Sequence, residues 1–170
     1  MLNEITLRYP QVVWTFITKY LGPPMDRRAW YIQQWLRGGD VPPIEGGGAL
    51  SSIPLAIVWQ WVDEDVERRA RYLASFVPPS LFRQEGHMCI AREVLIRYGD
   101  REDVRHAFMA NYSTGMWTGP ESAHYESVKQ QLLEFKEGEK NGNVNRWIDE
   151  YIHELNEYIQ QAKIREERKI

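Results

Sequence analysis

Cysteine is nearly absent from this chain of 170 residues, in which Cys89 stands alone. A single thiol cannot form an intrachain disulfide, so the sequence excludes the small extracellular domains that depend on disulfides for their stability. Unpaired cysteine is the norm in reducing compartments. We therefore expect a cytoplasmic protein.

Long apolar runs are also missing. The longest nearly apolar segment, Pro54 to Val62, contains Gln60 and is far shorter than the roughly 20 residues that a helix needs to cross a bilayer. The N-terminal stretch from Met1 to Pro10 lacks both the basic-then-apolar pattern and the small-residue cleavage site of a signal peptide. These absences predict a soluble chain that is neither membrane-spanning nor secreted.

Strand signals are almost lacking, because no Asn-Gly turn separates alternating runs and apolar residues mostly recur three and four apart. The hydrophobic share is 43%, and the chain contains seven Trp and nine Tyr. Each buried aromatic ring removes roughly 150–250 Å² from water, so these rings supply much of a core. The sequence predicts a single all-α domain over residues 1–170.

Proline and glycine divide the apolar pattern into helices that follow one another in pairs. Pro10 opens the first predicted helix, and the Gly-Pro-Pro segment at 22–24 ends it. Ser51 or Ser52 is expected to cap the third helix, with Pro54 in its first turn. The predicted helices cover residues 10–21, 26–37, 53–62, 66–77, 86–98 and 100–112, with a Gly-rich loop over 38–52.

An internal repeat organises this part of the chain. Residues 26–32 (DRRAWYI) match residues 67–73 (ERRARYL) at an offset of 41 positions. Three pairs of residues recur 38 and 40 positions apart, and their Asp or Asn side chains are expected to cap helices: Asp65-Val66, Asp103-Val104 and Asn143-Val144. Residues 8–112 are therefore interpreted as degenerate helix-pair repeats with a period near 40.

Residues 113–170 differ, with a loop followed by a long C-terminal antiparallel helix pair. Apolar residues spaced three and four apart form one narrow seam on each helix. The seam residues are Tyr125, Val128, Leu132 and Phe135 on the first helix, and Ile148, Ile152, Leu155, Ile159 and Ala162 on the second. We expect the two helices to zip together across the turn at 138–142 and to cap the stack.

The motif Gly99-Asp100-x-x-Asp103-Val104-Arg105-x-Ala107, together with the repeat period, resembles HEAT/armadillo helical repeats. In that family the second helix of each pair opens with an acidic residue followed by Asp-Val-Arg-x-Ala. The resemblance covers residues 10–112 and implies a HEAT-like α-solenoid of about four stacked helix pairs. The linker 38–52 and the last pair are longer than the family pattern. The resemblance implies no function of its own.

A second segment, Gly115-x-Trp117-x-Gly119-Pro120-x-x-x-His124-Tyr125, looks like helical segments near the C-termini of large bacterial proteins with an NTPase core, some of them linked to phage defence. The chain contains no NTPase motif. This resemblance therefore implies a sensing or scaffolding role only.

Catalytic signatures are missing. The chain has no Walker motif, no dinucleotide-binding glycine fingerprint and no Gly-x-Ser-x-Gly elbow. His153-Glu154 begins like the helix motif of zinc proteases, but Glu157 stands where the second His must be. The sequence predicts a protein that is not an enzyme.

Metal and cofactor sites are not expected either. His87-x-Cys89 supplies two ligands without the partners that complete a tetrahedral site, and Cys89 is interpreted as a buried apolar thiol. The acidic residues from Asp63 to Glu67 lie at a turn between helices, where acids cap the following helix and match its dipole. We expect no bound metal and no cofactor.

Arginine and tryptophan point to binding. Twelve of the thirteen cations in residues 1–110 are Arg, a residue that contacts carboxylates and phosphates bidentately. Trp117 lies in a loop of small polar residues, where it either anchors a partner or folds back onto the neighbouring helices. The other tryptophans are expected in the core or half-buried at its edge: Trp14, Trp30, Trp35, Trp59, Trp61 and Trp147. The predicted partner-binding residues are Trp117, Tyr112, Arg28, Arg69, Arg71 and Arg105.

Two functions fit this pattern. The first is a protein-interaction, scaffold or sensor module whose partner is a protein. The alternative is nucleic-acid binding by an Arg-lined face, for which Arg27, Arg28, Arg68, Arg69, Arg71, Arg101 and Arg105 could track phosphates. Residues 1–110 carry 13 basic and 13 acidic residues, a balance that speaks against phosphate binding. An enzymatic hypothesis that follows helical-repeat base-repair enzymes lacks a catalytic constellation.

Overall fold

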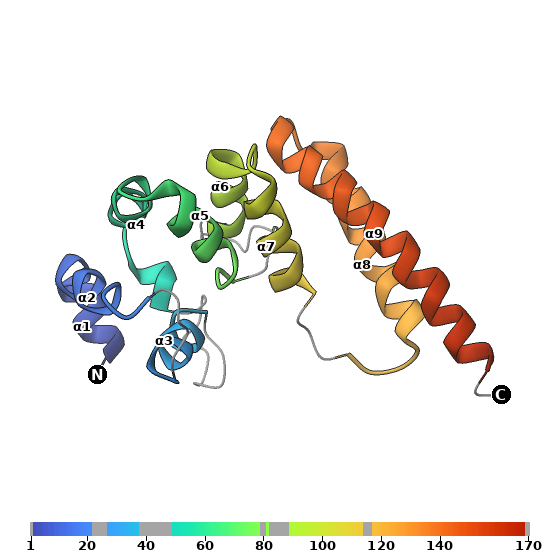
Figure 1. Ribbon diagram of the computed structural model, residues 1–170, viewed down its shortest axis with the longest axis horizontal. Coiled ribbons are helices and arrows are strands. Elements are labelled where there is room, and N and C mark those ends of the chain that lie inside the picture. Colours follow the sequence, from blue (N-terminus) through green and yellow to red (C-terminus); the bar gives the residue numbers. More distant parts are fainter. Residues whose placement is uncertain are drawn as a thin grey trace.

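The computed structural model describes residues 2–21, 27–37, 49–78, 81, 89–113 and 117–168. Within these ranges every regular element is a helix, which confirms the predicted all-α class (Figure 1). The elements are α1 (Leu2–Arg8), α2 (Pro10–Ile17), α3 (Arg27–Arg37), the 3-10 turn η1 (Ala49–Ser52), α4 (Leu55–Asp63), α5 (Val66–Ala74), α6 (Ile90–Tyr98), α7 (Glu102–Tyr112), α8 (Glu121–Gly138) and α9 (Gly142–Glu167).

The starts of the first helices differ in part from expectation. Pro10 opens α2 as predicted, but α1 precedes it and was not predicted. The serine cap proposed for the third helix is wrong, because Pro54 is the N-cap of α4 and Ser52 belongs to η1. The predicted Asp26 helix start, most of the Gly-rich loop and His87 lie outside the described residues.

The predicted caps of the later helices are right at one position and wrong at two. The Asp65 carboxylate accepts a hydrogen bond of 3.4 Å from the backbone N–H of Arg68 and caps α5. Asp103 lies inside α7, whose N-cap residue Arg101 makes no side-chain cap. Asn141, rather than Asn143, caps α9, since its side chain accepts from the N–H groups of residues 143 and 144 at 3.0 and 3.1 Å.

Successive helix pairs contact one another in chain order (Figure 1). Trp14 of α2 packs edge-on against Trp61 of α4, with ring centroids 5.5 Å apart. Gln33 of α3 donates a hydrogen bond of 2.6 Å to the Tyr72 hydroxyl of α5. The Asn111 amide of α7 donates to two carbonyls at the end of the α5 segment, at 3.0 and 2.7 Å. These contacts join α2 to α4, α3 to α5, and α5 to α7.

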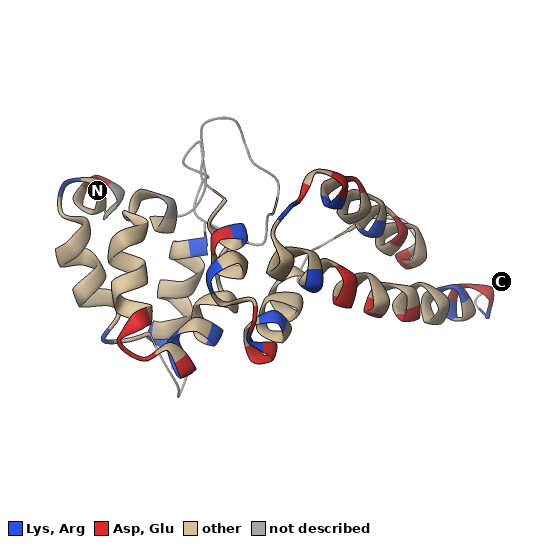
Figure 2. Ribbon diagram, turned by 90° about the horizontal axis from the view of Figure 1, so that it is seen from above, with Lys and Arg blue, Asp and Glu red and all other residues tan. Residues whose placement is uncertain are grey.

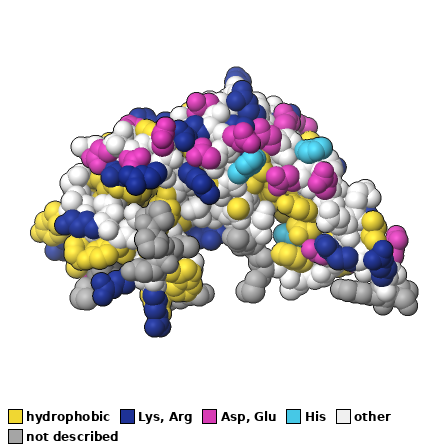
Figure 3. Space-filling model, in the orientation of Figure 1, with side chains coloured by type: hydrophobic (Ala, Val, Ile, Leu, Met, Phe, Trp, Pro, Cys, Tyr) yellow, Lys and Arg dark blue, Asp and Glu magenta, His cyan; other side chains and the backbone are white. Residues whose placement is uncertain are grey.

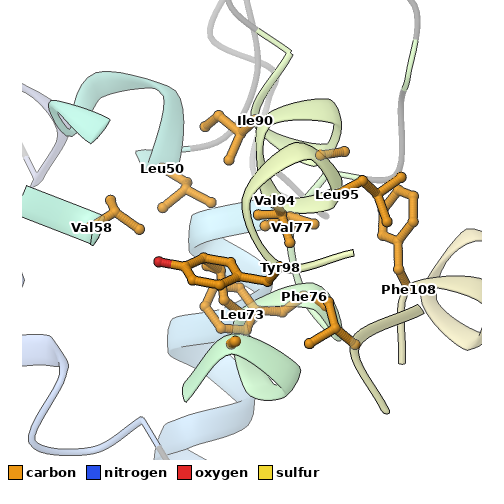
Figure 4. Packing of buried hydrophobic residues seen from close by; sticks show 14 of the residues in the cluster. Leu50, Val58, Leu73, Phe76, Val77, Ile90, Val94, Leu95, Tyr98 and Phe108 are labelled. Carbon is orange, nitrogen blue, oxygen red and sulfur yellow. The ribbon is translucent and has the colours of Figure 1, made fainter. Parts of the chain in front are cut away.

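One hydrophobic core runs through these pairs and into α8 and α9. Figure 4 shows part of it, where side chains from η1, α4, α5, α6 and α7 meet. Ala29 and Ala70, at matching positions of the repeated segment, are both buried. A small side chain leaves room for a neighbouring helix to pack closely, as α7 does on α5.

The helices α8 and α9 lie side by side along their length. Three ion pairs join them: Arg165 to Glu121 at 3.0 Å, Lys163 to Glu126 at 3.1 Å, and Lys136 to Asp149. These contacts link the start of α8 to the end of α9 and the end of α8 to the start of α9. Most of the predicted seam residues on α9 are buried, as is Leu132 on α8. The free end of this hairpin extends away from α7 (Figure 1).

The tryptophans divide into buried and exposed residues. Trp14, Trp61 and Trp147 are buried, and Trp35 and Trp59 are half-buried against the core. Trp30 is 45% exposed, so its assignment to the core is wrong.

No helix in the described ranges has both the length and the apolar character of a membrane span.

Candidate partner-binding surface

Trp117 lies between α7 and α8 and folds onto the first turns of α8. Its ring stacks on His124 with centroids 4.6 Å apart and planes 5° from parallel. The centroid of the Tyr125 ring lies 6.0 Å from that of the Trp117 ring. Because Trp117 remains 39% exposed, its indole is both held in place and open to solvent.

The row of rings continues across to α9. Tyr125 and Tyr158 have ring centroids 5.6 Å apart, and Tyr158 is 37% exposed. The Tyr125 hydroxyl donates to Glu121 at 3.1 Å, and the Tyr158 hydroxyl donates to Glu154 at 3.4 Å. We call Trp117, His124, Tyr125 and Tyr158 the aromatic patch. In the space-filling view, hydrophobic side chains gather around the hollow on the lower side of the molecule (Figure 3).

A second aromatic cluster fixes α9 to α7. Trp147 of α9 lies 4.8 Å from Phe108 and 5.5 Å from Tyr112, and Tyr112 lies 5.5 Å from Tyr151. Ser113 Oγ and the Tyr151 hydroxyl share a hydrogen bond of 3.0 Å. Burial raises the pKa of Tyr112 to about 12. Tyr112, a predicted partner-binding residue, is thus half-buried in an internal contact.

Two of the predicted arginines are held by the protein itself. Arg105 is 7% exposed; it donates to Glu150 at 2.7 Å and to the carbonyls of Gly99 and Asp100 at 3.0 and 2.9 Å. Arg69 donates to Glu64 and to the Trp61 carbonyl, both at 2.6 Å. Its guanidinium also stacks over the Trp61 ring at 5.1 Å. These contacts leave neither side chain free for a partner.

The remaining predicted arginines, Arg28 and Arg71, are exposed. Among the neighbours in the alternative hypothesis, Arg68 pairs with Asp65 and Arg101 pairs with Asp103 at 3.1 Å. Figure 2 shows acidic positions beside the basic ones along the first helix pairs. The structure therefore does not bring the predicted arginines together into one basic surface.

The acidic turn after α4 is occupied by internal contacts. Asp63 accepts from Arg97 at 2.8 Å and from the Tyr98 hydroxyl at 2.9 Å. Glu64 pairs with Arg69, and the Arg68 hydrogen bond lowers the pKa of Asp65. In the described part of the chain, no three His, Cys, Asp or Glu side chains come together as metal ligands.

Cys89 borders a cavity of about 490 Å³ between α6 and the end of α8. Burial raises the pKa of its thiol, which disfavours the thiolate that nucleophilic chemistry needs. The cavity is lined by Leu81, Cys89, Arg92, Glu93, Phe135, Gly138 and Glu139. Arg92 and Glu139 bind each other across it at 2.7 Å, so its polar groups satisfy one another.

No protein family, curated protein or solved structure matches this chain. The aromatic patch must therefore be judged on its own geometry. The sequence predicted a binding role for Trp117, placed Tyr125 in the helix seam and gave Tyr158 no such role. The available signal was the spacing of Trp147, Tyr151 and Tyr158 by four and seven residues, which places three large rings along one face of a helix.

Proposed function

We propose that this chain is a non-enzymatic protein-interaction module, a HEAT-like stack of helix pairs that binds a protein partner through the aromatic patch on its C-terminal hairpin. The observation that carries the proposal is Trp117, which is exposed to 39% while its ring is stacked on His124. Tryptophan and tyrosine are enriched among the residues that dominate binding energy in protein interfaces.

Rigidity supports this proposal. A side chain that is already fixed before binding loses little conformational entropy when a partner covers it. The stacked Trp117–His124 pair and the Tyr158–Glu154 hydrogen bond hold two exposed rings in this way. An aromatic patch of this kind favours affinity for a protein surface without further rearrangement.

Nucleic-acid binding receives less support. Phosphate binding requires several basic side chains that are free to contact the backbone. Arg69 and Arg105 are bound to carboxylates and carbonyls inside the protein. Of the arginines in the alternative, Arg27, Arg28 and Arg71 are exposed and form no ion pair within the described residues, and three such side chains are too small a basic set to carry it. A cytoplasmic location and a role in bacterial defence stay predictions.

Affinity capture tests the proposal. The full chain is immobilised, exposed to a lysate of its source organism, and compared with Trp117→Ala and Trp30→Ala. Trp30 is the matched control because it is also exposed, at 45%, but lies on α3 away from the patch. We expect at least one protein to be retained by the parent chain and by Trp30→Ala and to be lost from Trp117→Ala. Identical retained proteins for all three chains would overturn the proposed site.

A further inference from the structure

We propose that the aromatic patch recognises a cationic side chain, an arginine or lysine presented by the protein partner. This inference rests on the proposed function and specifies the chemistry of the partner. It follows from three features: unbalanced negative charge on α9, carboxylates beside the exposed rings, and the electrostatics of the rings themselves.

Negative charge is concentrated in the middle of α9. Between Arg146 and Lys163 the sequence contains no Lys or Arg but four acidic residues, and Figure 2 shows them recurring along the helix. Two of these acids are neutralised within the protein, Asp149 by Lys136 and Glu150 by Arg105. The remaining acids are Glu154 and Glu157.

Glu154 and Glu157 lie next to Tyr158 on α9. Glu154 accepts the Tyr158 hydroxyl hydrogen bond, which is a neutral contact. Glu157 lies 3.8 Å from His153, a residue that balances the charge only when it is protonated. Across the described ranges no Lys or Arg forms an ion pair with either carboxylate. This part of the surface therefore carries unbalanced negative charge.

The rings add to this negative potential. The faces of aromatic rings carry negative charge density and attract cations, most strongly for tryptophan. Trp117 and Tyr158 expose ring surface on the patch, with the Tyr125 ring between them. Burial and the nearby charges of Glu154 and Glu157 raise the pKa of Tyr158, in agreement with a negative surrounding field.

The nearby cations offset this charge only in part. Lys129 of α8 donates to Asn156 at 2.8 Å, beside Glu157, and offsets one of the two negative charges. Arg165 lies close enough to influence Tyr125, but it is paired with Glu121 at 3.0 Å. An arginine or lysine from a partner gains the exposed surface of two rings and two carboxylates that form no ion pair with a Lys or Arg of the described residues, whereas an acidic or phosphorylated segment meets like charge. Such repulsion selects against the wrong partner as effectively as attraction selects the right one.

The test uses a short Gly-Ser peptide that carries two arginines and a matched peptide in which neutral citrulline replaces both. Binding to the full chain is followed through the indole N–H signals of its seven tryptophans in two-dimensional NMR. Trp117→Ala assigns the Trp117 signal by its disappearance. We expect the arginine peptide to shift the Trp117 signal and leave the Trp30 signal in place, with the citrulline peptide binding at least tenfold more weakly.

A double variant, Glu154→Gln with Glu157→Gln, keeps every ring and removes the unbalanced charge. We expect it to weaken binding of the arginine peptide about fivefold, an effect of the size that a pair of surface charges produces. Equal binding of the two peptides, no shift of the Trp117 signal, or unchanged binding to the double variant would overturn the inference. If the peptides fail while Trp117-dependent capture of a protein persists, the partner chemistry is wrong and the proposed function stands.

Discussion

Gly99 lies between α6 and α7, where α9 passes close to the chain. A Cβ at this position would lie 2.3 Å from the Leu95 carbonyl oxygen and 3.1 Å from Cβ of Asn143. Since the backbone of α6 and the side chain of α9 both have to move, we expect Gly99→Ala to lower the free energy of unfolding by about 1–3 kcal/mol. Urea unfolding followed by circular dichroism measures this change.

Gly138, the last residue of α8, is the matched control. A Cβ there meets no atom within 4 Å. Gly138→Ala should therefore leave the free energy of unfolding within about 0.5 kcal/mol of the parent or raise it slightly. Equal losses in the two variants would show that close packing of α9 on Gly99 is not the cause.

Arg105 tests whether the repeated arginines serve the fold. Its guanidinium is buried and makes three hydrogen bonds, to Glu150 and two backbone carbonyls. We expect Arg105→Met to cost about 2 kcal/mol, because the acceptors lose their donor in a mostly buried site. Arg71→Met, at an exposed position, should change stability by less than about 0.5 kcal/mol. Thermal unfolding of the two variants compares them, and similar stability would contradict the structural role of Arg105.

Glu139, in the turn between α8 and α9, joins this turn to α6 through hydrogen bonds from Arg92. Its side chain is 2% exposed and accepts hydrogen bonds from Arg92 at 2.7 and 3.0 Å and from two backbone N–H groups at 2.8 Å. The Arg92 hydrogen bond lowers the pKa of Glu139 below its ordinary value of 4.5. The stabilisation it gives is therefore present above pH 4.5 and is lost as the pH falls through the lowered pKa.

We expect the free energy of unfolding to decrease on acidification below pH 4.5, and Glu139→Gln to flatten this decrease while lowering stability at pH 7. Urea unfolding at a series of pH values measures both effects. Glu137→Gln, at an exposed position two residues earlier, is the control and should keep the parent pH dependence. The same pH dependence in Glu139→Gln and the parent would contradict the role of this turn.

The positions of the helices could be predicted from the sequence more accurately than the residues at which they begin and end. Apolar spacing and proline located every predicted helix from α2 onward, because period and chain breakers act locally. The cap at Asp65 could be predicted for the same reason, whereas Asp103 and Asn143 lie one or two positions inside helices that begin earlier. The short helix α1 was missed because no clear apolar stripe marks it and its packing on η1 is a tertiary contact.

The candidate surface could be predicted only in part, because the environment of a side chain depends on residues distant in sequence. Arg28 and Arg69 occupy matching repeat positions, yet within the described residues only Arg69 has an acidic partner, Glu64, whose matching position in the sequence holds Pro23. Trp117 could be predicted as a binding residue because it is a large aromatic residue in a loop of small polar residues. Tyr158, on the second helix of the hairpin, joins the patch only through the pairing of α8 with α9.

The charge distribution of the whole molecule also gives a testable result. The net charge of the chain is −3. Each of four arginines forms an ion pair with a carboxylate of the protein: Arg68, Arg69, Arg101 and Arg105. We expect no saturable binding of a labelled DNA duplex at low salt, measured by fluorescence anisotropy. Tight binding that weakens steeply as salt rises would instead support the nucleic-acid alternative, since such a slope reports the release of counterions from phosphates.

The affinity of the captured partner for the parent chain, Trp117→Ala and Trp30→Ala, measured by isothermal titration calorimetry, is the most direct test of the proposed surface. A central tryptophan in an interface contributes about 2 kcal/mol or more, which corresponds to about a thirtyfold change in Kd. We predict at least that loss for Trp117→Ala and less than a twofold change for Trp30→Ala. Equal affinities for all three chains would contradict the proposed role of the aromatic patch.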